Sequence, residues 1–162
     1  MLSFHYNALV FTLRPYREAD FPRIMEIDHL CFVEGIAYPE DEMRYFLRLP
    51  TARTIVAEDA SGRIMGFIIA DAFRPRRFSA LMGRIITIDV EPSVQKSGLG
   101  RQLLKAAEQH VREAGCKQII LEVAVDNAPA LRFYKKAGYS VLKSLPRYYM
   151  DSLDGLLMGK KL

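Results

Sequence analysis

A short segment rich in glycine and basic residues, Gln95-Lys96-Ser97-Gly98-Leu99-Gly100-Arg101, has the composition of an anion-binding loop. It precedes the pattern of a long helix, and a helix N-terminus presents unpaired N–H groups and the positive end of the helix dipole. Glycine lets a phosphate approach the backbone closely. The third glycine of the dinucleotide fingerprint and the lysine–serine pair of a Walker loop are absent, so the segment predicts phosphate binding without a nucleotide-enzyme motif.

Two residues further along the chain could move protons. Glu122 lies in an apolar strand pattern and faces opposite Leu121 and Val123, so it is a candidate general base. A carboxylate on a solvated sheet face, or one paired with an arginine, fits the same pattern. Tyr134 is a candidate general acid because a phenol has a pKa of about 10, while a core aromatic beside Phe133 is the alternative.

The elements that must position these residues follow the order βααβββαβαββ. Strands are predicted at 9–14, 54–58, 64–73, 84–90, 119–125, 140–145 and 155–162, with a loop at 146–149. Helices are predicted after an N-cap at Asp20, after Pro39, over 98–114, and after an N-cap at Asn127. The apolar run within 64–73 indicates a strand covered on both faces. This alternation predicts an α/β (α+β) fold, a mixed sheet with helices on both sides.

Length and composition limit the possible number of domains, membrane spans and cellular locations. The chain has 162 residues, half of them apolar and about a quarter charged, which predicts one globular domain over residues 1–162. It contains no apolar run long enough to span a membrane. Residues 1–6 lack a basic segment followed by a continuous apolar one, so we expect no secretory signal, no membrane partner and a cytoplasmic location.

The charged and metal-binding residue types give no strong signal of their own. The net charge of +4 is spread along the chain, so nucleic-acid binding is not expected. The densest basic cluster, Arg74-Pro75-Arg76-Arg77, fits a solvated loop or a contact with an acidic partner. Cys31 and Cys116 form neither a disulfide framework nor a zinc pattern and are predicted to pack. The three histidines lack ligand spacing, so no metal is expected.

The motifs together resemble a known family. The pattern Gln-x-x-Gly-x-Gly after Ile88-Asp89-Val90 resembles motif A of the GNAT superfamily of N-acetyltransferases. Leu121-Glu122-Val123, Asn127-Ala128-Pro129-Ala130, Phe133-Tyr134 and Gly138-Tyr139 resemble the second half of that signature. The resemblance spans about residues 86–139 and implies a GNAT-like, mainly antiparallel central sheet.

Within the superfamily, the chain resembles ribosomal-protein alanine N-acetyltransferases and archaeal N-terminal acetyltransferases. Three features carry this likeness: the twelve-residue spacing from Glu122 to Tyr134, the loop at 32–39, and Arg147-Tyr148-Tyr149. The loop at 32–39 is the least exact of the three matches.

The resemblance implies acetyl-CoA as cosubstrate and no metal. It places the pyrophosphate on residues 95–101 and the pantetheine arm along Ile88, Asp89, Val90 and Asn127, with Tyr134 at the thioester sulfur. It further implies direct attack by the amine in a ternary complex, with Glu122 as general base and Tyr134 as general acid.

The acceptor implied by the resemblance is the α-amine at a protein or peptide N-terminus, with a ribosomal protein as one candidate. Glu34 would attract the cationic N-terminus, Phe32, Ile36 and Tyr38 would form an apolar wall, and Tyr148 and Tyr149 would line a peptide groove. The tyrosine pair could instead simply pack in its hairpin. A small-molecule amine or a lysine side chain is the alternative acceptor, and a catalytically silent acyl-CoA sensor is the alternative class. We expect a monomer or weak dimer.

Overall fold

The computed structural model describes residues 9–77 and 79–162, and its elements follow the predicted order. Residues 1–6, whose sequence suggested no export signal, lie outside the described residues. The helices are α1 (Phe21–Cys31), α2 (Glu40–Arg48), α3 (Leu99–Glu113) and α4 (Ala128–Lys136). The strands are β1 (Thr12–Pro15), β2 (Ala52–Glu58), β3 (Ile64–Phe73), β4 (Met82–Val90), β5 (Gln118–Ala124), β6 (Ser140–Tyr149) and β7 (Leu153–Lys161).

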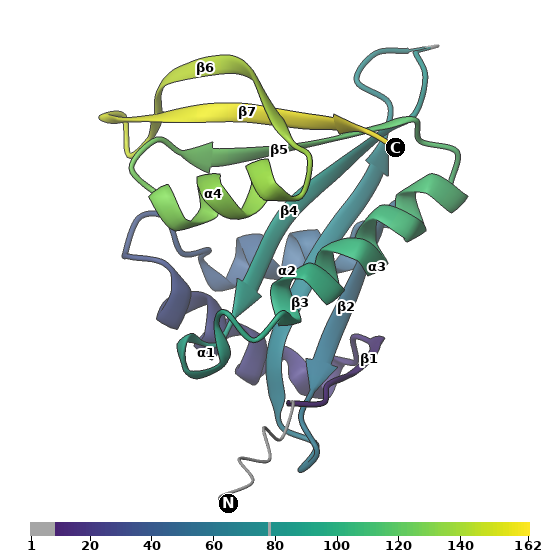
Figure 1. Ribbon diagram of the computed structural model, residues 1–162, viewed down its shortest axis with the longest axis vertical. Helices are drawn as coiled ribbons and strands as arrows, with labels where there is room; N and C mark the ends of the chain where they lie inside the picture. Colours follow the sequence, from purple (N-terminus) through teal and green to yellow (C-terminus); the bar gives the residue numbers. More distant parts are fainter. Residues whose placement is uncertain (1–8, 78) are drawn as a thin grey trace, which may run out of the picture.

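The seven strands form one sheet in the order β1-β2-β3-β4-β5-β7-β6. Only β4 and β5 run parallel among the described neighbours, and every other pair is antiparallel. Helices α3 and α4 cover the near face of the sheet in Figure 1, and α1 and α2 cover the far face. This confirms the predicted mixed, mainly antiparallel sheet between helices.

Strand β3 supplies both cores, as its continuous apolar run predicted. Ile68 joins the cluster beneath α3, which includes Leu103. Phe67 and Ile69 join the cluster on the other face, which includes Ile24 of α1. Because successive strand residues point to opposite faces, an apolar residue is needed at every position of a strand covered on both sides.

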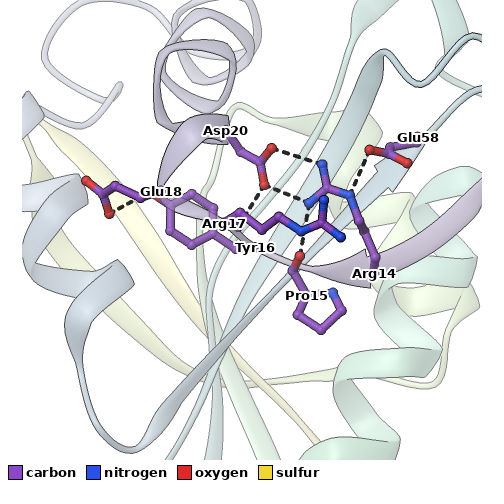
Figure 2. A network of polar contacts seen from close by, with 7 residues as sticks. All are labelled: Arg14, Pro15, Tyr16, Arg17, Glu18, Asp20 and Glu58. Atoms are coloured by element: carbon purple, nitrogen blue, oxygen red, sulfur yellow. Dashed lines mark hydrogen bonds and ion pairs between the residues drawn. The ribbon is translucent and has the colours of Figure 1, made fainter.

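The start of α1 is held by a polar network, shown in Figure 2. The Arg14 guanidinium donates to both carboxylate oxygens of Asp20, at 2.7 and 2.9 Å, and to Glu58 at 2.7 Å. Asp20 also accepts the Arg17 N–H at 2.8 Å. Asp20 occupies the predicted N-cap position, but its side chain makes no cap bond to α1. These donors, above all Arg14, hold the pKa of Asp20 below its ordinary value.

The largest difference from the predicted elements is the loop expected at 146–149, which is part of β6. The ladder to β7 shifts register between Leu145 and Tyr149, and Arg147 has a positive φ of 51°. Pro146 lacks an N–H, but β6 is an edge strand and tolerates it. The first strand also begins at Thr12 rather than at residue 9.

The structure also bears on the sequence features that concern membrane spans, metal sites and the two cysteines. Of the helices in the described residues, none combines the length and apolar character needed to cross a bilayer. Within 9–77 and 79–162, no group of three His, Cys, Asp or Glu residues is arranged to hold a metal ion. Cys116 is buried in the core, as predicted, and Cys31 is half-buried with its Sγ donating to the Val90 carbonyl at 3.2 Å.

Candidate active site

The sheet is open between β4 and β5. Their parallel ladder has two register pairs, Gly83–Ile119 and Arg84–Ile120, although each strand continues well beyond them. Figure 1 shows the two strands diverging from the corner near the C-terminus. A register shift against β3 leaves Ile86 as an extra residue in β4. Over the described part of β4, the backbone from Thr87 to Val90 therefore has a strand partner on the β3 side only.

The predicted phosphate loop leads from the end of β4 into α3. Gln95 Nε2 donates to the Val90 carbonyl at 3.1 Å, which ties the loop to the strand. Gly98 is the N-cap of α3 and has a φ of 90°, a backbone conformation that favours glycine. No acceptor in the described residues takes the N–H groups of Gly98, Gly100 or Arg101. The loop thus presents free donors at a helix N-terminus.

The other members of this segment divide between surface and core. Lys96 and Arg101 are exposed, and Lys96 itself has a positive φ of 63°. Leu99, the first residue of α3, is fully buried, so only its backbone can face a ligand. Its N–H lies 3.4 Å from the Ser97 Oγ that accepts it. The segment therefore offers two exposed cationic side chains beside backbone donors.

Glu122 and Tyr134, the two candidate proton-transfer residues, differ in burial. Glu122 is half-buried on the face of β5 opposite the buried Leu121 and Val123, as predicted. Tyr134 of α4 is 7% exposed, and burial raises the pKa of its phenol above the ordinary value. Its hydroxyl therefore keeps its proton at physiological pH. Asn127 Oδ1 accepts the Ala130 N–H at 3.2 Å, which confirms the predicted cap of α4.

The tyrosines of β6 connect these two residues. Burial, then the charge of Glu122 and a hydrogen bond with it, raise the pKa of Tyr148. Burial and then the charges of Tyr148 and Glu122 raise the pKa of Tyr149, which is also an electrostatic neighbour of Tyr134. Tyr148 and Tyr149 are thus electrostatic neighbours of Glu122, and Tyr149 is also an electrostatic neighbour of Tyr134.

A groove of about 870 Å³ adjoins this group. The residues expected from the sequence to contact an acceptor all line it: Phe32, Glu34, Ile36, Tyr38, Tyr148 and Tyr149. The two segments that supply them lie against each other, since a Cβ at Gly35 would be 2.7 Å from Met150 Sδ. The sequence reasoning missed His29 and Glu42, which also line the groove.

A buried pair of acids beside the groove was missed as well. Asp28 of α1 and Asp89 of β4 are 0% and 1% exposed, and their carboxyl groups interact electrostatically with each other. Burial, partly offset by a hydrogen bond from Tyr38, raises the pKa of Asp28. Burial and then the Asp28 charge raise that of Asp89. Asp89 was expected to contact the cosubstrate through its backbone, and its buried side chain interacts with Asp28 of α1. Each acid interrupts an apolar pattern in the sequence, but nothing in that pattern indicates that the two lie together.

The comparisons with known proteins agree with these features. Residues 21–139 match the model of the acetyltransferase (GNAT) family. An uncharacterized N-acetyltransferase of Methanocaldococcus jannaschii is 33% identical over 150 residues, covering 92% of this chain and 90% of the relative. An N-alpha-acetyltransferase of Sulfurisphaera tokodaii is 31% identical, covering 86% and 90%. The crystal structure of Ard1 from Thermoplasma volcanium superposes with a TM-score of 0.82 at 27% identity, covering 94% and 97%. As the motifs predicted, the chain belongs to the GNAT family of acetyltransferases.

Proposed function

We propose that this GNAT acetyltransferase transfers the acetyl group of acetyl-CoA to the α-amine at protein or peptide N-termini. The observation that carries the proposal is the groove formed by the loop at 32–39 and the β6 tyrosines. It adjoins both candidate proton-transfer residues, because Tyr148 and Tyr149 interact with Glu122 and Tyr149 interacts with Tyr134. Relatives named N-alpha-acetyltransferase support the same acceptor class.

The proposed cosubstrate site uses the loop at 95–101 and the open edge of β4. The free N–H groups of Gly98, Gly100 and Arg101 at the start of α3 suit a pyrophosphate, with Lys96 and the Arg101 side chain adding charge. The backbone at Ile88, Asp89 and Val90 has no strand partner on the β5 side, and this open side suits the amides of a pantetheine arm. The strongest evidence for this assignment is the set of free N–H groups at the start of α3 beside that open side.

The proposed chemistry is direct attack. An α-amine has a pKa of roughly 8, so much of it must lose a proton near neutral pH, and Glu122 would accept that proton directly or through water. The nitrogen then forms a bond to the thioester carbonyl carbon, and the carbon–sulfur bond breaks. The departing thiolate takes the proton of Tyr134. The nitrogen loses its second proton as it becomes an amide nitrogen, and that proton, relayed through water, restores the phenol of Tyr134.

The residues that line the groove suit a peptide N-terminus. Glu34 provides a negative charge for a cationic N-terminus, and Phe32 and Ile36 provide apolar contacts for the first side chain. Tyr148 and Tyr149 present hydroxyl groups that suit a peptide backbone.

The proposal is tested with purified protein, acetyl-CoA and three kinds of acceptor. These are short peptides with varied first residues, the same peptides with a blocked N-terminus and a free lysine, and a polyamine. We expect thiol release and a single α-acetyl group, located by mass spectrometry, only with the free N-termini. Acetylation confined to lysine or the polyamine would replace the acceptor class. No thiol release with any amine would favour the silent acyl-CoA sensor.

A further inference from the structure

The acid pair between α1 and β4 has an unusual hydrogen-bond arrangement. Asp28 Oδ2 accepts the backbone N–H of Tyr38 at 2.8 Å, and Asp89 Oδ1 accepts the Thr87 hydroxyl at 2.6 Å. The other two oxygens, Asp28 Oδ1 and Asp89 Oδ2, are fully buried and receive no donor from the described residues. One proton placed between these two oxygens would satisfy both at once.

Among the described residues, no lysine or arginine interacts with the pair, and the His29 imidazole is the one neighbour that can carry a positive charge. The titratable groups in electrostatic contact with the pair are His29 and Cys31 of α1, Tyr38 of the groove loop and Tyr134 of α4. Among the described salt bridges, none includes Asp28 or Asp89. Two buried carboxylates side by side cannot both ionise without a large cost, so one of them retains its proton.

The pair also lies on the path by which the groove loop is attached to β4. Tyr38 is held from both ends, through its N–H to Asp28 and through its hydroxyl, which donates to the Ile86 carbonyl at 3.3 Å. Cys31 adds a third contact, from its Sγ to the Val90 carbonyl. Asp28 therefore connects a residue that lines the groove to the strand that borders the open part of the sheet.

We propose that Asp28 and Asp89 share one proton and that this neutralised pair positions the groove loop at 32–39 on β4. The two carboxyl side chains act as positioning groups, through Tyr38, and touch neither cosubstrate nor acceptor. The part concerning acceptor binding rests on the proposed function, because it takes this loop as the wall of the acceptor site. Loss of the shared proton at high pH leaves two adjacent negative charges and loosens the loop, so acceptor affinity falls as pH rises.

Two measurements test the pair without any substrate. The infrared spectrum of the purified protein near neutral pH is expected to contain the C=O stretch of a protonated, buried carboxyl. That band disappears in Asp89→Asn, whose amide N–H replaces the shared proton, and it stays in Asp20→Asn, a matched change at a buried aspartate held by Arg14. Absence of the band from the wild type, or its persistence in Asp89→Asn, overturns the proton sharing.

Hydrogen exchange tests the positioning. Asp89→Ala leaves the Asp28 charge buried and alone, so we expect amide exchange across 32–39 to speed up by about tenfold, the equivalent of one lost hydrogen bond. Asp89→Asn and Asp20→Asn keep the wild-type rate there. Equal protection of this loop in all four proteins overturns the positioning role. If Asp89→Ala does not fold, Asp89→Asn is compared with Asp28→Ala/Asp89→Asn, which removes the acceptor of the Tyr38 N–H. Only the double variant is expected to lose the protection of the loop, and equal protection overturns the positioning role.

Steady-state kinetics connect the pair to the acceptor. Asp89→Ala should raise the acceptor KM about tenfold while the acetyl-CoA KM changes less than twofold. The pH profile is measured in a His29→Gln background, to remove the imidazole, from about pH 6 to about pH 9, a range that covers documented buried carboxyls. Acceptor KM should rise with pH relative to the Asp89→Asn protein. If the loop loosens but acceptor KM stays constant, the groove is not the acceptor site and the proposed function is at fault, while the proton pair stands.

Discussion

Helix α1 has a buried aspartate near each end, and the two have opposite surroundings. Asp20, just before the helix, receives two hydrogen bonds from the Arg14 guanidinium and has a lowered pKa (Figure 2). Asp28, in the second half of the helix, faces Asp89 without a lysine or arginine partner among the described salt bridges and has a raised pKa. The helix dipole strengthens this contrast, since it favours negative charge at the N-terminus and disfavours it toward the C-terminus.

The two ends of α1 therefore have different roles: the Asp20 end contributes to stability and the Asp28 end to function. The Asp20 end joins α1 to β1 and β2 through satisfied ion pairs, far along the helix from the groove. The Asp28 end contains two acids whose ionisation costs stability, and it supports a loop that lines the groove. Locally unfavourable polar groups tend to persist where function requires them. Substitutions at the two ends should therefore affect different measurements.

The largest expected effect belongs to the groove side of this comparison. Glu122→Gln should reduce turnover by about 10²-fold, because an amide cannot accept the proton of the amine. The deficit should be greatest at low pH, where most of the amine is protonated. Melting temperature should stay unchanged, since Glu122 is half-exposed. Asp126→Asn, an exposed acid four residues later, is the control, and equal activity of the two variants would remove Glu122 as the base.

A change of the same order is expected at the buried tyrosine. Tyr134→Phe removes the proton donor while keeping the aromatic packing against Phe133 and Tyr139, so turnover should fall by about 10²-fold with acetyl-CoA affinity nearly constant. Tyr139→Phe is the matched control: it loses a hydrogen bond to Glu108 and should lower stability instead of turnover. Reversal of these two outcomes would contradict the roles given to the tyrosines.

At the other end of α1, Arg14→Ala should lower the free energy of unfolding by about 2 kcal/mol. The substitution leaves Asp20 buried with its charge and without its main donor, which is the costly way to break an ion pair. Turnover per folded molecule should not change. Urea unfolding checks the first claim, and Arg17→Ala, which removes a neighbouring exposed charge, should change stability by less than about 0.5 kcal/mol.

The pH dependence of stability should have opposite signs at the two ends. Asp20 has a lowered pKa, so its contribution is present above the unfolded pKa of about 4 and is lost as pH falls. Asp89 has a raised pKa, so its contribution is present below about pH 4 and is lost as pH rises toward the folded value. Between about pH 4 and the folded pKa of Asp89, the free energy of unfolding of Asp89→Asn should therefore rise relative to that of the wild type by up to about 1.4 kcal/mol per pH unit.

Urea unfolding at a series of pH values measures this. The free energy of unfolding of Asp89→Asn, relative to that of the wild type, is expected to rise as pH rises. The free energy of unfolding of Asp20→Asn, relative to that of the wild type, is expected to fall as pH rises. Parallel curves for the two variants would mean that the two aspartates are equivalent, and the comparison would fail.

The smallest expected effect is at the rim of the groove. Tyr148 is 50% exposed, and its hydroxyl interacts with Glu122. Tyr148→Phe should raise the acceptor KM about threefold, consistent with one modest hydrogen bond, and leave the melting temperature unchanged. A loss as large as that of Glu122→Gln would indicate that Tyr148 takes part in the chemistry itself.

Local signals explain how much of the fold could be predicted. The order of elements follows from periodicity and from strong punctuation, such as Asn127 before α4 and Gly98 before α3. The exception is the stretch after Leu145, where proline suggested a loop. Its place in β6 depends on a partner strand and on a register shift, and neither is visible in a window of a few residues.

The residues of the site also differ in whether they could be predicted from the sequence. The loop at 95–101 could be recognised because its function resides in contiguous backbone, and the groove residues because their two segments carry family motifs. The Asp28–Asp89 pair could not be predicted, because the two residues are 61 positions apart in the chain and lie in a helix and a strand. Each acid alone looks like an isolated polar residue in an apolar pattern.

Both outer strands of the sheet contain a proline, Pro15 in β1 and Pro146 in β6. An edge strand offers unpaired N–H and C=O groups to any strand of another molecule, and proline removes one of the donors such an addition requires. At β6 the positive φ of Arg147 distorts the edge further. The residues that interrupt β6 therefore have a protective consequence as well: they hinder edge-to-edge aggregation at the strand that carries Tyr148 and Tyr149.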